Sequence, residues 1–259
     1  MAFLQTHEVS MRFGGIDALN NVSIGAEPGL VTGLIGPNGA GKTTLFNIIT
    51  GLQPPTSGQV FIEGEDVTSM SVYRRARLGI GRTFQRLEIF GSLSVRDNIR
   101  VTVEVRRRWS RQRTDIKKAT DAILARVGLE EFANVPADTL PTGSARLVEL
   151  GRALATQPRL LLLDEPGSGL DATETEAFGQ LLANLAEDGL AVLLVEHDMD
   201  LVMKACSHLM VLDFGALIAS GTPEEIRANQ QVQDAYLGAE EPPARGITEP
   251  GLAGAGTLP

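Results

Sequence analysis

Cysteines that could pair, apolar runs of membrane length and an excess of basic residues are all missing from this chain of 259 residues. The single cysteine, Cys206, excludes an internal disulfide, and we expect it in the core because apolar residues precede it. No run approaches the roughly 18 apolar residues of a membrane span. The first residues, MAFLQTHEVS, lack the basic start and apolar centre of a secretory signal peptide, so none is expected. A role at a membrane would therefore require a partner protein.

Acidic residues outnumber basic residues by 32 to 23, which gives a formal net charge of −9. No nucleic-acid partner is expected, because nucleic-acid phosphates are bound by basic surfaces. Basic residues do form two local clusters, and the simplest interpretation is that each is a solvated helix face. The clusters are Arg74, Arg75 and Arg77, and then Arg106, Arg107, Arg108, Arg111 and Arg113.

Strands and helices are predicted to alternate along most of the chain. Continuous apolar runs predict strands that are covered on both faces, whereas strict alternation predicts a half-exposed strand. The apolar runs are 29–36, 159–165 and 190–197, the alternating strand is 58–64, and helices are predicted over 42–52 and 171–189. Two capping boxes mark helix starts, Asp171 with Glu174 and Thr222 with Glu225. This order predicts an α/β fold.

Two segments depart from the alternation. The polar helical stretch of about 86–144 is predicted to be a separate lobe inserted into a domain that covers 1–238. After 238 the composition shifts to alanine, glycine, proline and glutamate, so 239–259 is predicted to be a disordered tail.

A glycine-rich loop lies between a predicted strand and a predicted helix. Its spacing, GPNGAGKT, is that of a phosphate-binding loop, in which backbone N–H groups face a polyphosphate. The lysine would reach the β- and γ-phosphates, and the first threonine would bind Mg²⁺. A glycine-rich turn with an incidental lysine is the alternative, which the strand before and the helix after make less attractive. The candidate nucleotide-binding residues are Gly36, Pro37, Asn38, Gly39, Ala40, Gly41, Lys42, Thr43 and Thr44.

Acidic and polar residues follow the other buried strands. Asp164 ends one strand, where a carboxylate can hold Mg²⁺, and Glu165 beside it can orient or deprotonate water. Taken alone, the pair could simply end a strand. Gln85 and His197 are candidates to contact Mg²⁺, water or the γ-phosphate. ATP is favoured over GTP because the chain has no Asn-Lys-x-Asp motif that reads guanine.

With these residues, the chain resembles the ATP-binding subunits of ABC transporters. The resemblance covers 3–237 and includes the phosphate loop, Gln85, Asp164-Glu165, the stretch SGLD and His197, in the family's order. It implies a P-loop NTPase (RecA-like) core with an antiparallel β subdomain and an inserted helical lobe, and an ATPase that uses ATP and Mg²⁺. Phe13 stands where the family places an aromatic ring against adenine, although a core or surface phenylalanine is the alternative.

The family's signature loop, usually Leu-Ser-Gly-Gly-Gln, is altered in this chain. It corresponds to 140–144, where Pro141 replaces the serine, Thr142 the first glycine and Ser144 the glutamine, while Gly143 is kept. In the family this loop caps the ATP held by the other subunit. Hydrogen-bond donors remain in this loop, since Thr142 and Ser144 carry hydroxyl groups and Gly143 and Ser144 carry backbone N–H groups. Thr142, Gly143 and Ser144 are therefore still candidates for contact with the nucleotide. If the partner subunit carries the usual signature loop, we expect the two ATP sites to be unequal, with the better site on this chain's phosphate loop. The alternative is that Thr142 fully replaces the missing serine and the two sites are equal.

Within the family, the chain looks most like the ATPases of branched-chain amino acid importers, through 82–99, 193–203 and 219–238. This implies a peripheral subunit at the cytoplasmic face of the plasma membrane. Its partners would be integral-membrane permeases, a second ATP-binding subunit of the same or another kind, and a solute-binding protein. Urea or amide import, lipid export and a non-transport ABC ATPase remain open alternatives.

One further expectation concerns the permease. A groove beside Gln85 is expected to receive a short cytoplasmic permease helix, although some of its apolar residues could instead be internal to the lobe. The flanking residues would be Arg82, Arg86, Leu87, Ile89 and Phe90.

Overall fold

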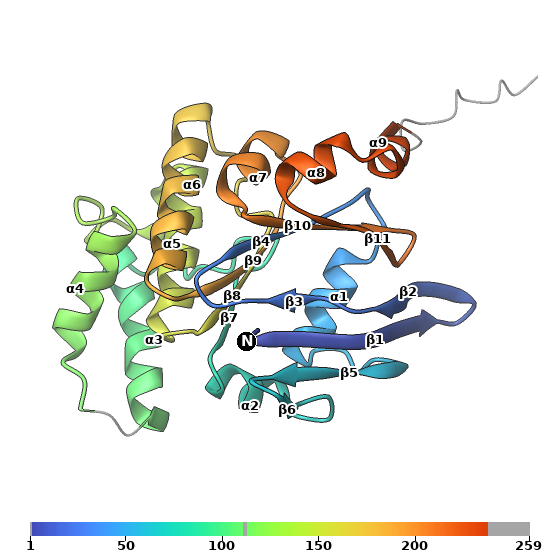
Figure 1. The fold of residues 1–259 in the computed structure, drawn as a ribbon. Coiled ribbons are helices and arrows are strands. Elements are labelled where there is room, and N and C mark those ends of the chain that lie inside the picture. Colours follow the sequence, from blue (N-terminus) through green and yellow to red (C-terminus); the bar gives the residue numbers. More distant parts are fainter. Residues whose placement is uncertain (1, 111–112, 238–259) are drawn as a thin grey trace, which may run out of the picture.

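The computed structural model describes residues 2–110 and 113–237, so the predicted tail lies outside the described residues. Two sheets and a set of helices make up this part of the chain (Figure 1). The antiparallel sheet has the order β2-β1-β5-β6, with β3 paired to β1. Its strands are β1 (Leu4–Phe13), β2 (Ile16–Val22), β3 (Gly25–Ala26), β5 (Ser57–Ile62) and β6 (Glu65–Asp66).

The second sheet has six strands in the order β11-β10-β4-β9-β8-β7. Neighbours from β10 to β7 are parallel, and β11 pairs antiparallel with β10. The strands are β4 (Val31–Ile35), β7 (Ile80–Arg82), β8 (Leu160–Asp164), β9 (Ala191–Val195), β10 (His208–Asp213) and β11 (Ala216–Gly221). A mainly parallel sheet beside an antiparallel one confirms the predicted fold class.

Helices surround the parallel sheet, and α3, α4 and α5 project to one side as the lobe (Figure 1). Within the polar stretch of about 86–144, the described residues form the two α-helices α3 and α4, and α5 begins at its end. The described helices are α1 (Lys42–Thr50), α2 (Val72–Arg77), α3 (Val95–Ser110), α4 (Ile116–Arg126), the 3₁₀ turn η1 (Ala137–Thr139), α5 (Thr142–Ala155), α6 (Ala172–Glu187), α7 (Met199–Ala205), α8 (Pro223–Ala228) and α9 (Gln230–Leu237). None of the helices in this described part is long and apolar enough to cross a membrane.

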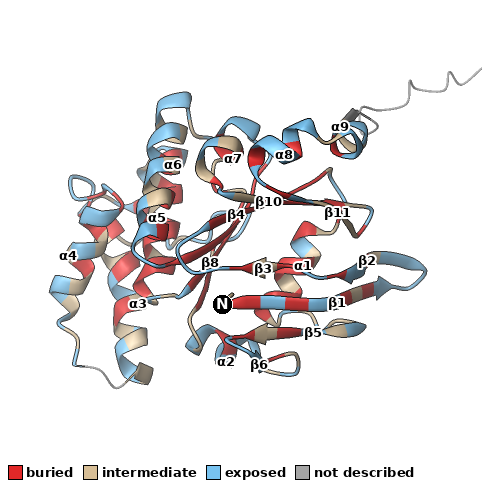
Figure 2. Cartoon of the chain, viewed as in Figure 1, coloured by how far each residue is buried: buried red, intermediate tan, exposed pale blue. Residues whose placement is uncertain are grey.

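The parallel sheet separates two hydrophobic cores (Figure 2). Along β8, Leu161 and Leu163 point into one core, while Leu160 and Leu162 point into the other. Both faces are therefore covered, which is why the strand sequence is continuously apolar. Cys206 lies in the first core, as predicted, and burial raises the pKa of its thiol to about 12.

Both predicted capping boxes are confirmed at the N-termini of α6 and α8. The prediction that the first arginine cluster is a solvated face is wrong for Arg75, which is 1% exposed. Its guanidinium donates to the carbonyls of Ile48 (2.6 Å) and Ile49 (2.8 Å) at the C-terminal end of α1. The carbonyls at a helix C-terminus and the negative end of the helix dipole favour a cation there. In the second cluster Arg106 is half-buried, and Arg111 lies outside the described residues.

Candidate functional site

The predicted site residues come from strands that lie side by side. The order β4-β9-β8-β7 places the phosphate loop after β4 and His197 after β9 at one edge of the sheet. Asp164 and Glu165 at the end of β8, and Gln85 after β7, belong to the same edge. Carboxyl ends of parallel strands form the binding crevice of open α/β sheets. The fold therefore gathers residues that are more than 150 positions apart in the chain.

The phosphate loop has a backbone that only glycine permits at two points. Gly36 (φ 149°) and Gly41 (φ 103°) both adopt positive φ values. A Cβ on Gly36 would lie 2.0 Å from the carbonyl oxygen of Leu212, and one on Gly41 would lie 2.6 Å from that of Ala18. Side chains are excluded at both positions, so the loop can wrap with its N–H groups turned to one side.

Lys42 is held by its own loop. Its Nζ donates to the carbonyl oxygens of Gly36 (2.6 Å) and Pro37 (2.9 Å). Burial lowers the pKa of Lys42, and the nearby carboxylates of Glu165 and Asp164 oppose that shift. None of the ion pairs among the described residues includes Lys42. A buried cation bonded only to carbonyls, inside a cradle of glycines, fits a polyphosphate anion.

Asp164 is almost completely buried, at 2% exposed. Burial raises the pKa of its carboxyl group, while the guanidinium of Arg82 lowers it, with Nη2 donating to Oδ2 at 3.2 Å. Thr43, at the start of α1, keeps an exposed side chain. A buried carboxylate together with a threonine hydroxyl is a donor set that Mg²⁺ accepts.

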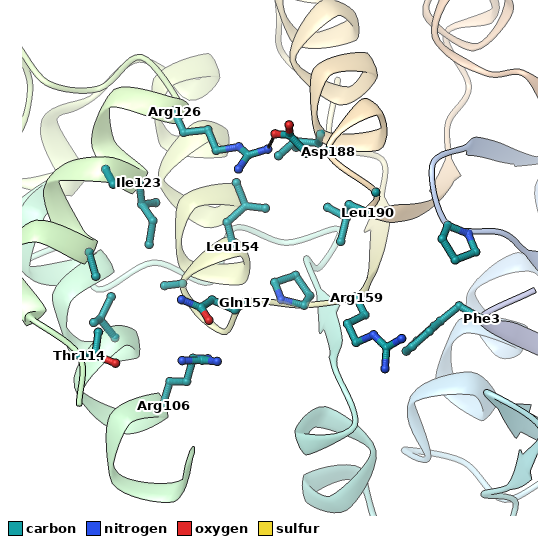
Figure 3. A pocket seen from close by; sticks show the side chains of 18 residues that line it. Phe3, Arg106, Thr114, Ile123, Arg126, Leu154, Gln157, Arg159, Asp188 and Leu190 are labelled. Carbon is teal, nitrogen blue, oxygen red and sulfur yellow. Dashed lines mark hydrogen bonds and ion pairs between the residues drawn. The ribbon is translucent and has the colours of Figure 1, made fainter. Parts of the chain in front are cut away.

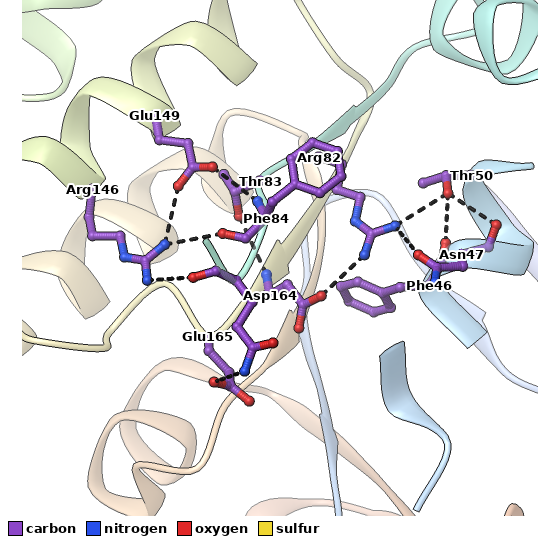
Figure 4. Close-up of polar contacts among 11 residues, drawn as sticks. Phe46, Asn47, Thr50, Arg82, Thr83, Phe84, Arg146, Glu149, Asp164 and Glu165 are labelled. Atoms are coloured by element: carbon purple, nitrogen blue, oxygen red, sulfur yellow. Dashed lines mark hydrogen bonds and ion pairs between the residues drawn. The ribbon is translucent and has the colours of Figure 1, made fainter. Parts of the chain in front are cut away.

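Arg82 corrects one sequence-based expectation. It was predicted to flank a permease groove, but its side chain is only 8% exposed and faces the site. Its Nη1 donates to Oδ1 of Asn47 at 2.7 Å, and its guanidinium lies 4.9 Å from the centre of the Phe84 ring (Figure 4). An isolated arginine in the sequence gives no indication of such a role, because the contact to Asp164 spans 82 positions.

Two of the predicted catalytic residues, Gln85 and His197, contact the third, Glu165. Glu165 accepts a hydrogen bond from Nε2 of Gln85 at 3.0 Å, and its other carboxylate oxygen lies 2.7 Å from Nε2 of His197. Glu165 itself has a positive φ of 51°, and its N–H donates to the carbonyl of Val195 on β9. Strained backbone of this kind concentrates at functional sites. The carboxylate is thus oriented from two sides.

Glu196 is a buried carboxylate that the sequence analysis missed. Its Oε1 accepts from the N–H of Gly167 at 2.5 Å and its Oε2 accepts from the N–H of His197 at 3.0 Å. Burial raises the pKa of Glu196, and these backbone donors lower it. The side chain therefore ties the loop after β8 to the loop after β9. Its position directly before His197 was the one indication in the sequence.

The altered signature segment forms the N-terminus of α5. Pro141 is the N-cap residue, and no hydrogen bond or ion pair among the described residues joins Thr142, Gly143 or Ser144 to the phosphate loop. The segment lies against the start of α6 instead. A Cβ on Gly143 would be 2.7 Å from Oε1 of Glu174, and one on Gly169 would be 2.8 Å from the methyl carbon of Thr142.

Phe13 ends β1 and is 48% exposed. It pairs with Ile16 across a hairpin whose second strand also carries Ala18 and Leu19, the residues next to Gly41 of the phosphate loop. An exposed aromatic ring close to that loop is available for stacking, and its contact with adenine stays a prediction.

A cavity of about 500 Å³ lies at the opposite end of the parallel strands, between the lobe and the core (Figure 3). Three arginines line it, but each already has a contact. Arg126 pairs with Asp188, Arg159 pairs with Glu63, and Arg106 donates to the carbonyl of Thr156. None of the predicted site residues lines this cavity.

Comparisons with known proteins agree on one family. The family model described as ABC transporter matches 19–168, and that described as branched-chain amino acid ATP-binding cassette transporter matches 216–242. The high-affinity branched-chain amino acid transport ATP-binding protein BraF of Pseudomonas aeruginosa is 40% identical over 248 residues, covering 91% of this chain and 97% of the relative. LivG of Escherichia coli K12, which has the same description, is 38% identical with the same coverage.

Solved structures give the same result. A nucleotide-free ATP-binding cassette from an ABC transporter superposes with a TM-score of 0.81 and 30% identity, over 91% of this chain and 99% of that one. The ADP conformation of an ATP-binding cassette of an ABC transporter has a TM-score of 0.81 and 30% identity, over 92% and 99%.

Proposed function

Because the chain belongs to the family of ABC transporter ATP-binding proteins, we propose that it hydrolyses ATP to energise the import of branched-chain amino acids. The observation that supports this most is the position of Glu165, whose carboxylate contacts both Gln85 and His197 beside the phosphate loop. The branched-chain substrate is supported by the names of the relatives and by the match of 216–242.

The phosphate loop and the first turn of α1, from Gly36 to Thr44, would hold the phosphates, and Phe13 would contact the adenine. Lys42 would exchange its two carbonyl partners for the β- and γ-phosphates. Thr43, Gln85 and Asp164 would hold Mg²⁺, and the bound ion would supply positive charge that offsets the negative charge of the phosphates. Glu165 would orient a water molecule and accept its proton, while His197 keeps the carboxylate in place.

The same proposal includes a partner subunit and a membrane complex. A second ATP-binding subunit would present its signature loop to the ATP of this chain, and Thr142, Gly143 and Ser144 would face the ATP of the partner. Integral-membrane permeases would hold both subunits at the cytoplasmic face of the plasma membrane, with a solute-binding protein delivering the amino acid. Arg86, Leu87 and Phe90 are exposed beside Gln85 and would contact a permease helix, whereas Ile89 packs against the first of the two hydrophobic cores.

Two substitutions test the hydrolytic site. Glu165→Gln should retain ATP binding while turnover collapses, because it keeps the shape of the side chain and removes the base. Lys42→Ala should instead weaken binding itself. Both are measured in the assembled transporter, by steady-state ATPase rates and by nucleotide affinity. Near-native turnover of Glu165→Gln would show that this glutamate is not the base.

A separate experiment tests the substrate. Cells that lack this subunit should lose uptake of labelled leucine, isoleucine and valine, and the wild-type chain should restore it. Glu165→Gln, supplied in the same way, should not restore it. Unchanged leucine uptake together with lost urea uptake would assign the chain to the alternative importer class.

A further inference from the structure

Two buried charged residues of α5, Arg146 and Glu149, make hydrogen bonds to the backbone that leads into Gln85 (Figure 4). Arg146 is 8% exposed and Glu149 is 5% exposed. Arg146 donates to the carbonyl oxygen of Phe84 at 3.1 Å and to that of Gln85 at 2.8 Å. Glu149 accepts a hydrogen bond from the N–H of Phe84 at 3.1 Å. Their side chains also pair with each other at 3.3 Å.

These contacts take the place of a strand partner. β7 ends at Arg82, and the N–H of Thr83 is the last in this segment that donates to β8, at the carbonyl of Leu162. The peptide groups of Phe84 and Gln85 lie beyond the sheet ladder, so the sheet does not supply their hydrogen-bond partners. Arg146 and Glu149, which belong to α5, make three hydrogen bonds to these peptide groups.

A core helix gains no obvious stability from such a pair. Burial raises the pKa of Glu149, and the N–H of Phe84 and the guanidinium of Arg146 lower it. Apolar residues of similar volume commonly replace buried ion pairs without loss of stability. The neighbours on the helix, Ala145, Val148 and Leu150, are themselves buried and apolar. The bonds to Phe84 and Gln85 are what apolar side chains could not make.

We infer that Arg146 and Glu149 are positioning residues for ATP hydrolysis, which fix the backbone at Gln85 so that its amide stays against Glu165. The pair begins two residues after Ser144, on the helix that starts with the signature segment. One helix, α5, therefore carries both the signature segment and the side chains that bind the backbone at Gln85. The inference rests on the proposed function, which assigns Gln85 and Glu165 to hydrolysis.

The test removes both charges together, so that neither is left buried alone. In the assembled transporter, Arg146→Met with Glu149→Gln should lower kcat about ten- to hundredfold, the effect of losing one charge-assisted hydrogen bond. KM for ATP should stay within about twofold, since no hydrogen bond or ion pair in the described part of the chain joins Arg146 or Glu149 to the phosphate loop. Arg106→Met is the matched control, because Arg106 is a half-buried arginine that also donates to a backbone carbonyl, that of Thr156 at 2.9 Å, but at the opposite end of the parallel strands. It should keep the wild-type kcat.

A second background separates positioning from general damage. In a Gln85→Ala chain, the double substitution should lower kcat no further, because the residue it positions is already gone. An equal loss in both backgrounds would overturn the inference while leaving the proposed function intact. If Gln85→Ala alone kept wild-type turnover, the role in hydrolysis proposed for Gln85 would be wrong, and the positioning role of Arg146 and Glu149 would be wrong with it. Should the double variant not assemble, Arg146→Lys keeps the charge but cannot span both carbonyls, and should give the same pattern.

Discussion

Arg82→Met is expected to destabilise the nucleotide-free chain by about 3–5 kcal/mol, the cost of breaking a buried ion pair by removing one partner. The pair with Asp164 is 3.2 Å long, and both side chains are at least nine-tenths buried. At that separation, an effective dielectric constant of about 20 gives about 5 kcal/mol of attraction. The substitution also removes the cost of burying the guanidinium, whose Nε has no hydrogen-bond partner among the described residues. The net loss should therefore not exceed this range.

The assay is urea unfolding of the isolated chain without nucleotide, followed by far-ultraviolet circular dichroism. Variants with equal m values can be compared directly by their unfolding free energies. Arg12→Met is the matched control, because Arg12 pairs with Asp17 at 3.3 Å but both side chains are more than half exposed. An exposed pair contributes about 0–1 kcal/mol, so the control separates burial from ion pairing as such.

A double-mutant cycle shows whether the loss comes from Asp164. In an Asp164→Asn background, Arg82→Met should cost at least about 2 kcal/mol less than in the wild-type chain, because no buried carboxylate is left unpaired. If the two costs agreed within about 0.5 kcal/mol, which is the additivity expected of independent sites, the reasoning would be refuted.

Two further predictions concern the thiol and the signature segment. Cys206, with its pKa of about 12 and 6% exposure, should resist a thiol reagent at pH 8 in the folded chain and react once urea unfolds it; rapid reaction under native conditions would contradict its burial. In a complex with a subunit of ordinary signature, Glu165→Gln in this chain should reduce ATPase activity more than the equivalent change in the partner, because the partner's ATP faces Thr142 and Ser144 instead of the usual residues. Equal losses would show that the two sites are equivalent.

The sequence predicted the elements whose pattern is local. β8 and β9 are continuous apolar runs because both faces of the sheet are covered, and the capping boxes of α6 and α8 each lie within four residues. Gln85, Glu165 and His197 were predicted as candidates from their places after strands and from the resemblance to ABC transporter ATPases. The structure brings them together because the carboxyl ends of parallel strands share one binding edge.

The contacts that support those residues could not be predicted in the same way. Arg82 pairs with a carboxylate 82 positions away, and Arg146 binds carbonyls more than 60 positions away. An arginine on an amphipathic helix is usually solvated. The sequence of the helix does not show whether the guanidinium faces water or is bound by backbone groups of another element. Arg75 was misjudged for this reason, since its partners are carbonyls, which every sequence contains.

The geometry of the altered signature segment favours unequal sites over full replacement. Pro141 costs α5 little, because the first N–H groups of a helix have no partner within it. The N–H groups of Thr142, Gly143 and Ser144 therefore remain suited to an anion. However, the carboxylate of Glu174 lies against Gly143, and the methyl group of Thr142 lies against Gly169. A carboxylate at this helix end already offsets part of the positive dipole that a γ-phosphate would use. The missing serine hydroxyl and this nearby negative charge act in the same direction, so the ATP held by the partner should be bound less well than the ATP held by this chain.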